Sequence, residues 1–201
     1  MRRIITITVI VLVVLGVGGF VWYTWPRDRE PEVVIPPQEE EPIETTRTYT
    51  STSLGYSLTY PLAYTQSDHT YEFSPTKNIE GGFKVTVPVA LATGTNLSSD
   101  SYLAIEQLPN ARNCTGDIFL TANVKASETT EGGVTYSVAS STEAAAGNHY
   151  EEWVWALNDS TPCTAVRYYI HSSTDATGTA EFNHEVLLQE FNSIRQSLRK
   201  I

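Results

Sequence analysis

Basic residues are scarce in this chain, which has 13 lysines and arginines against 23 aspartates and glutamates. A protein with this acidic balance lacks the electrostatic attraction that draws nucleic acids or anionic lipids to a surface. The sequence also lacks a basic patch with interleaved aromatic residues, the pattern typical of a nucleic-acid interface. We therefore expect no nucleic-acid partner.

Cysteine is rare as well, with only Cys114 and Cys163 in the whole chain. No metal-ligand spacing surrounds either cysteine, so a structural zinc site is not expected. In a domain outside the cytoplasm, two thiols most simply form one disulfide. Two unpaired buried thiols are the alternative that the sequence leaves open.

The familiar patterns of catalytic sites are missing too. The sequence contains no nucleophile elbow and no zincin motif, and its paired glycines lie in turn contexts rather than phosphate-binding ones. Hydrolysis needs a nucleophile, a base and an orienting group brought together. We therefore predict no catalytic residue and no cofactor, and we favour a binding role over an enzyme.

Charge is absent from residues 4–25, an apolar run long enough to span the roughly 30 Å hydrocarbon core of a bilayer. Trp22, Tyr23 and Trp25 lie at its downstream end, where amphipathic rings favour the headgroup level. A cleavable signal peptide is the main alternative, but it requires a small-residue cleavage site, and no alanine precedes Ala63. The run predicts a transmembrane anchor.

The flanks of the anchor predict its orientation. Under the positive-inside rule, Arg2 and Arg3 before the run are nearly balanced by Arg27 and Arg29 after it. The short N-terminus, residues 1–3, and the two cysteines of the later domain favour an N-terminus in the cytoplasm. Residues 26–47 contain five prolines and seven acidic residues and predict a disordered linker. Residues 48–201 then form one domain outside the cytoplasm, which makes the chain a single-pass protein of the cell membrane.

The domain alternates short strand patterns with two helical ones. Period-two alternation and aromatic or β-branched runs predict strands. Apolar residues three and four positions apart predict helices. The predicted strands are residues 56–60, 71–73, 82–87, 134–138, 149–157 and 164–171, and the predicted helices are residues 102–108 and 181–198. This order is typical of an α+β fold with an antiparallel sheet flanked by helices.

The segment Gly55-Tyr-Ser-Leu-Thr-Tyr-Pro61, the order of elements after it and the amphipathic C-terminal helix resemble the PsbP-like fold. Uncharacterised bacterial membrane-anchored or lipid-anchored proteins look similar, particularly around residues 165–171 and 181–198. The resemblance implies an α/β/α sandwich that serves as a binding or assembly module without enzymatic activity of its own.

The strands at 149–157 and 164–171 predict a hairpin, because a five-residue polar loop joins them. Pairing them symmetrically about the loop places His149 opposite His171, with Glu151 on the same face. Two histidines and a carboxylate could bind a divalent metal. The alternative is a solvated strand end, and a slip of one residue would put the histidines on opposite faces.

The same pairing gathers Trp153, Trp155, Arg167 and Tyr169 on one face. If this face is exposed, its aromatic rings and single cation form a candidate surface for binding a partner. If it is buried, it is the packing of the sheet against a helix, which is common for tryptophan.

We therefore expect a membrane-anchored, non-enzymatic domain that binds a protein or another component of the cell envelope. A hydrolase or metal-dependent enzyme with an unrecognised site is the first alternative. A structural accessory subunit of a membrane complex, whose transmembrane helix makes the contacts, is the second.

Overall fold

The computed structural model describes residues 44–68, 80–174 and 178–201. All of them belong to the compact unit Ile43–Ile201. The predicted anchor at residues 4–25, most of the predicted linker and the strand predicted at 71–73 lie outside the described residues. Within the described part, no helix is both long and apolar enough to span a bilayer.

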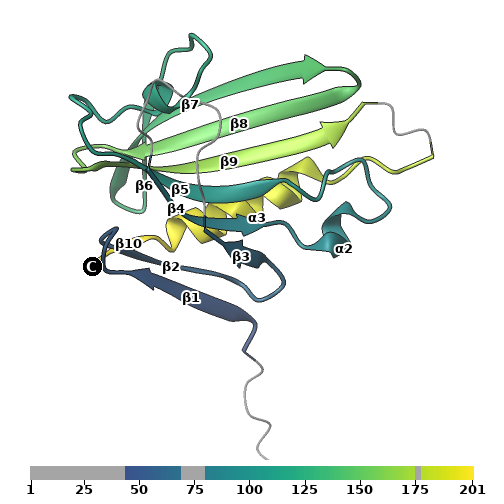
Figure 1. Cartoon of the computed structure of the whole chain (residues 1–201), viewed down its shortest axis with the longest axis horizontal. Helices are drawn as coiled ribbons and strands as arrows, with labels where there is room; N and C mark the ends of the chain where they lie inside the picture. The colour runs from purple at the N-terminus through teal and green to yellow at the C-terminus, as the bar shows by residue number, and fades with distance from the viewer. Residues whose placement is uncertain (1–43, 69–79, 175–177) are drawn as a thin grey trace, which may run out of the picture. The chain divides into compact units, whose positions relative to one another are not determined.

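A seven-stranded antiparallel sheet dominates the domain (Figure 1). It contains four strands that the sequence predicts, at 82–87, 134–138, 149–157 and 164–171, one strand in the segment 102–108 that was predicted to be a helix, and two short edge strands. In spatial order the strands are β3 (Thr65–Ser67), β4 (Glu80–Thr86), β5 (Tyr102–Leu108), β9 (Cys163–Ser173), β8 (Asn148–Leu157), β7 (Val134–Ala145) and β6 (Ser127–Glu131).

A second, three-stranded sheet has the order β1 (Thr46–Ser51), β2 (Tyr56–Pro61) and β10 (Arg199–Lys200). The predicted linker therefore ends two residues early, because Thr46 and Arg47 pair with Pro61 and Tyr60 as part of β1. The described residues contain one long helix, α3 (His184–Gln196), one turn of helix, α2 (Val89–Ala92), and one 3-10 turn, η1 (Gly116–Phe119).

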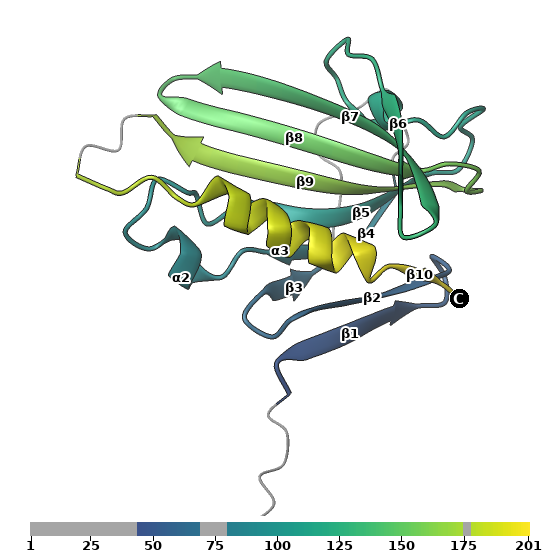
Figure 2. The same cartoon turned by 180° about the vertical axis from the view of Figure 1, so that it is seen from behind.

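Helix α3 lies along one face of the large sheet (Figure 2). It begins where the Asn183 side chain accepts a hydrogen bond from the backbone N–H of Val186, and this N-cap satisfies one of the first free amides. Leu187, Phe191 and Ile194 recur at helical spacing and are buried. Val186, which the periodicity also assigns to the apolar face, is 42% exposed.

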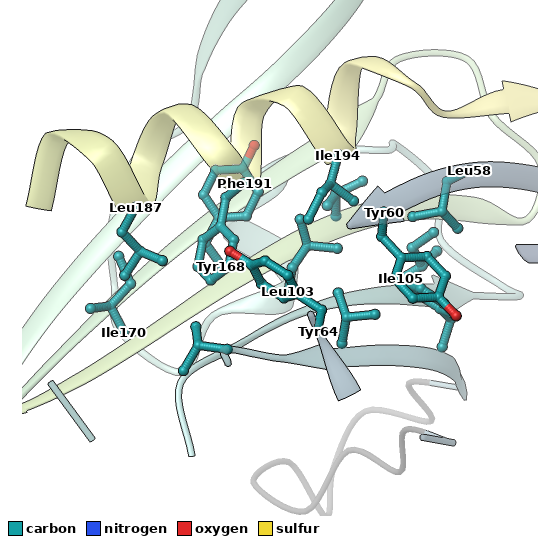
Figure 3. Packing of buried hydrophobic residues seen from close by; sticks show 14 of the residues in the cluster. Leu58, Tyr60, Tyr64, Leu103, Ile105, Tyr168, Ile170, Leu187, Phe191 and Ile194 are labelled. Atoms are coloured by element: carbon teal, nitrogen blue, oxygen red, sulfur yellow. The ribbon is translucent and has the colours of Figure 1, made fainter. Parts of the chain in front are cut away.

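The main core fills the space between α3, β2 and this face of the sheet (Figure 3). Phe191 packs on Tyr168 of β9, with ring centroids 5.2 Å apart. The other labelled side chains of this cluster come from β2, β5, β9, α3 and the turn after β2: Leu58, Tyr60, Tyr64, Leu103, Ile105, Ile170, Leu187 and Ile194.

A second core covers part of the opposite face of the sheet. Phe119 and Leu120, at the end of η1, pack against Val154, Ala156 and Ala165. In the described residues this face carries η1 and loops rather than a layer of helices, so the α+β class is confirmed with fewer helices than an α/β/α sandwich implies.

The helix predicted at residues 102–108 is wrong, because this segment is strand β5. It pairs with β4 on one side and with β9 on the other. Its residues are buried toward both faces, Leu103 and Ile105 toward α3 and Ala104 toward η1. A strand that is buried on both faces reads as one continuous apolar run, and periodicity alone does not separate it from a buried helix.

Candidate functional site

The hairpin formed by β8 and β9 is confirmed, but its register differs by one residue from the symmetrical pairing. Tyr150 lies opposite His171, and Trp153 lies opposite Tyr168. The loop closes asymmetrically: Asp159 has a left-handed φ of 61°, and the N–H of Thr164 donates to the Ser160 hydroxyl at 2.8 Å. Because side chains alternate across a strand, this shift exchanges the faces of all residues on one strand relative to the other.

The predicted metal-binding trio does not come together. His149 lies opposite Ser172, so it points to the face opposite that of His171. Glu151 lies on the α3 face, where its carboxylate accepts hydrogen bonds from the indole N–H of Trp153 and from His184. Among the described residues, no three histidine, cysteine or acidic side chains form a group suited to a metal ion.

The predicted aromatic face is divided between the two sides of the sheet. Trp153 and Trp155 pack against the main core beside α3. Arg167 and Tyr169 lie on the opposite face, since they pair with Val154 and Glu152. These four residues therefore do not form one binding surface.

The guanidinium of Arg167 is 1% exposed and lies in a cluster of acceptors. Its Nε and one Nη donate to the Glu106 carboxylate at 2.8 and 3.0 Å, and it also donates to Glu152 and to the carbonyl of Phe119. A bidentate guanidinium–carboxylate pair satisfies the two charges that the sheet and η1 bury together. Arg167 thus joins β5, β8 and β9 beneath η1.

The shifted register assembles a different group, here called the tyrosine row: Tyr102, Tyr169 and Tyr150, with His171 at its end. Tyr102 stacks on Tyr169 with ring centroids 4.9 Å apart, and Tyr150 lies 6.2 Å from Tyr169. Tyr150 also stacks on His171 at 4.5 Å. The row runs across β5, β9 and β8 on the face away from α3, and each of its four side chains is partly exposed.

His171 is held from three sides. Its Nδ1 lies 2.8 Å from the carboxylate of Asp100, and its Nε2 lies 2.9 Å from the side-chain oxygen of Asn148. Its backbone N–H donates to the hydroxyl of Ser101 at 3.0 Å. The Asn148 amide nitrogen donates to the carbonyl of Ala146, which leaves the amide oxygen facing the ring. These contacts fix the position and orientation of the imidazole.

Beside His171 the surface is hollowed over about 340 Å³. All but one of the lining residues carry a hydroxyl, amide or imidazole group: Thr95, Asn96, Leu97, Ser98, Asn148, His171, Ser173 and Thr179. Such groups donate and accept hydrogen bonds with a polar ligand. The ring nitrogens of His171 are hydrogen-bonded to Asp100 and Asn148, so the ring is not aligned on a serine hydroxyl as nucleophilic catalysis requires.

Partial burial, Asp100 and Tyr150 together raise the pKa of Tyr169 to about 12. Burial favours the neutral phenol, and the nearby aspartate disfavours a second negative charge. Tyr169 therefore remains an uncharged hydrogen-bond donor at the pH of a cell.

The sequence patterns did not point to this site for two reasons. Tyr102 fell in the segment predicted to be a helix, and Tyr150 and His171 were placed on different faces by the symmetrical register. Tyr150 and Tyr169 both fall in predicted strands, but only the true register shows that they share a face.

No family model matches the chain, and no curated protein matches it. Similar solved structures include a crystal structure of a protein from Bacteroides thetaiotaomicron VPI-5482, at 13% identity and a TM-score of 0.45. That similarity covers 79% of this chain and 49% of the other, so the chain spans about half of that protein.

Another similar structure is the solution structure of cyanobacterial PsbP (CyanoP) from Synechocystis sp. PCC 6803, also at 13% identity and a TM-score of 0.45. It covers 83% of this chain and 99% of the other. A PsbP protein is thus among the structures to which this chain is similar, as the sequence resemblance predicts. Similarity at this level assigns no function or partner to the chain.

Proposed function

We propose that this chain is a single-pass membrane protein whose domain, outside the cytoplasm, is a non-enzymatic binding or assembly module. Residues 4–25 hold it in the cell membrane with the N-terminus in the cytoplasm. The tyrosine row and the hollow beside His171 bind a protein or another component of the cell envelope.

The location outside the cytoplasm is supported by the disulfide between Cys114 and Cys163, whose sulfur atoms are 2.08 Å apart. Disulfides persist in oxidising compartments and are rare in the cytosol, where thiols are kept reduced. The described residues contain no free cysteine, as expected for a domain folded under oxidising conditions. The predicted pairing of the two cysteines is confirmed.

The tyrosine row is the observation that carries the binding role. Tyrosine offers a large contact area and a hydroxyl group, with few rotatable bonds to immobilise on binding. Here the rings are already fixed by stacking, and His171 is fixed by Asp100 and Asn148. A surface that is ordered before binding loses little entropy when a partner docks.

Site-specific photo-crosslinking tests the binding face. A photoreactive phenylalanine analogue replaces Tyr150 in the full-length chain, and a matched chain carries it at Gln189, an exposed position on α3. Irradiated membranes should yield an adduct from position 150 that position 189 does not give. Identical adduct patterns at both positions, or no adduct at position 150, would contradict binding at the tyrosine row.

Protease accessibility in intact cells tests the topology separately. A protease added from outside should digest the domain before the cytoplasmic membrane is permeabilised. Digestion only after that membrane is opened would place the domain in the cytoplasm and overturn this part of the proposal.

A further inference from the structure

A second surface of the domain is apolar and lies on the side of α2 and α3, away from the tyrosine row. Val89 of α2 is 72% exposed, Leu62 after β2 is 40% exposed and Val186 of α3 is 42% exposed. In the described part of the chain, these are three of the four large apolar residues that are exposed. Val186 lines a hollow beside α2, and Val89 and Leu62 are chain neighbours of the hollow-lining residues Ala90 and Pro61. These three exposed residues, with Ala90 and Leu91, are here called the α2 surface.

Two hollows flank α2 and share Ala90 and Leu91 as lining residues. One, of about 570 Å³, lies against β2 and the C-terminal half of α3, and the other, of about 200 Å³, lies against the start of α3. Helix α2 has no buried residue, and this single turn of helix lies between two apolar depressions. Exposed and contiguous apolar area of this kind is typical of a surface that contacts a partner or a membrane.

The α2 surface offers little charge. Tyr60, Tyr64 and Glu190 are the ionisable groups in the walls of the two hollows, and the Tyr64 hydroxyl donates to the Glu190 carboxylate at 2.5 Å. Burial and this carboxylate both raise the pKa of Tyr64, so the phenol keeps its proton and the hydrogen bond. The lining contains no lysine or arginine, and it therefore has no attraction for an acidic partner.

The start of the domain lies at the same place. Thr46, the first residue of β1, lines the larger hollow. The residues between the proposed anchor and this point are 26–45, and a fully extended chain of that length spans about 70 Å. A tether of this length keeps the α2 surface within reach of the bilayer and raises its effective concentration there.

We propose that the α2 surface rests on the bilayer that holds the anchor, with Val89, Leu62 and Val186 at the boundary between headgroups and acyl chains. This inference rests on the proposed membrane anchor. Apolar hollows whose walls contain no lysine or arginine suit a zwitterionic lipid surface, because such a contact is driven by apolar burial rather than by charge. The tyrosine row, on the other face of the sheet, stays open to its partner.

A fluorescent label at position 89 tests this contact. Both native cysteines are joined in the disulfide, so Val89→Cys supplies a single free thiol in the part of the chain described, and the anchor and linker contain no cysteine. The full-length chain is labelled with an environment-sensitive dye and reconstituted in phosphatidylcholine vesicles, with and without spin-labelled lipid. Thr142→Cys, at an exposed position of β7, is the matched control.

The label at position 89 should emit at shorter wavelength than the label at 142 and be quenched several-fold more by spin-labelled lipid. Adding Val186→Asp should reduce this quenching while the chain remains folded and vesicle-bound. If the protein floats with the vesicles but both labels emit as they do in water, the α2 surface does not contact the bilayer. That result would overturn this inference and leave the proposed anchor unaffected. A blue shift without quenching, lost when the protein is diluted in the bilayer, would show that a second copy of this chain covers the α2 surface. That result would overturn the inference. A chain that does not float with vesicles overturns both proposals.

Discussion

One buried side chain, Arg195, connects the end of α3 to the large sheet. The Arg195 guanidinium is 1% exposed and lies over the Trp155 ring at 3.8 Å and the Tyr136 ring at 4.8 Å. Its Nε donates to the Tyr168 hydroxyl at 2.7 Å, and one Nη donates to Glu131 at 2.6 Å. A flat cation with several donors satisfies all these contacts at once.

We predict that Arg195→Lys destabilises the domain by about 2 kcal/mol, because an ammonium group loses the ring stacking and leaves buried acceptors without donors. Urea denaturation measures the change. Arg199→Lys is the control, since the Arg199 side chain is exposed and donates only to the carbonyls of Gln196 and Leu198. Equal effects of the two substitutions would contradict the role assigned to Arg195.

The same contact predicts a pH dependence. The hydrogen bond from Arg195 lowers the pKa of Glu131 below its ordinary value of 4.5. A carboxyl group whose pKa is lowered by folding stabilises the folded state above its ordinary pKa and loses that contribution as the pH falls through the lowered value. Glu131→Gln should therefore be less stable than the wild type at pH 7, and the difference should shrink below about pH 4.5. A difference that stays constant between pH 7 and pH 3 would show that the charge of Glu131 is not involved.

At the scale of elements, local patterns predicted most of the structure. In strands with one face in the core, apolar and polar residues alternate clearly. The strands predicted at 56–60, 82–87, 134–138, 149–157 and 164–171 are all present. The terminal helix was predicted from its apolar stripe and begins three residues later, at the Asn183 cap. The patterns missed the short strands β1, β3, β6 and β10. They also failed for β5, which is buried on both faces, and for the register of β8 against β9, which depends on a loop closed by Asp159.

The turn η1 shows how one small residue positions an element. A Cβ atom at Gly116 would lie 2.7 Å from the Ala139 nitrogen and 2.8 Å from the carbonyl oxygens of Ser137 and Val154. These are backbone atoms of β7 and β8, which cannot move aside without disturbing the sheet. Gly116→Ala should therefore lift η1 and cost about 1–3 kcal/mol of unfolding free energy.

Chemical denaturation of Gly116→Ala against Thr115→Ala gives the comparison. Thr115 is the neighbouring residue, and its side chain makes no capping hydrogen bond. We expect Gly116→Ala to lower the unfolding free energy clearly more than Thr115→Ala, and equal effects would contradict the role assigned to Gly116.

At the scale of the whole molecule, composition predicted the class of protein better than its binding site. The charge balance, the two cysteines and the order of elements led to an α+β domain with one disulfide, and both are confirmed. The sequence left open whether the face of Trp153 and Trp155 is exposed for binding or packed against a helix, because only tertiary pairing decides which face α3 covers. The two tryptophans pack against the core. Tyr102 and His171 lie 69 positions apart in the sequence and share a row only through β9.

The disulfide closes a loop between residues separated by 49 positions. In the chain-entropy model, a loop of this size stabilises the folded state by about 4 kcal/mol. The variant Cys114→Ala with Cys163→Ala should lose about that much unfolding free energy relative to the oxidised wild type. In the presence of a reductant, the wild type should have the same unfolding free energy as the variant. An unfolding midpoint that does not change on reduction would contradict the contribution assigned to the disulfide.

The most direct test of the central claim compares partner capture by variants of the full-length chain, crosslinked in membranes before purification. Tyr150→Ala with Tyr169→Ala removes the middle of the tyrosine row. Tyr49→Ala removes a partly buried tyrosine of β1 and controls for lost stability. We predict that the row variant recovers about tenfold less of the crosslinked partner, which corresponds to about 1.4 kcal/mol of binding free energy, while the control recovers as much as the wild type. Equal recovery by the row variant and the control would contradict the claim that this face binds the partner.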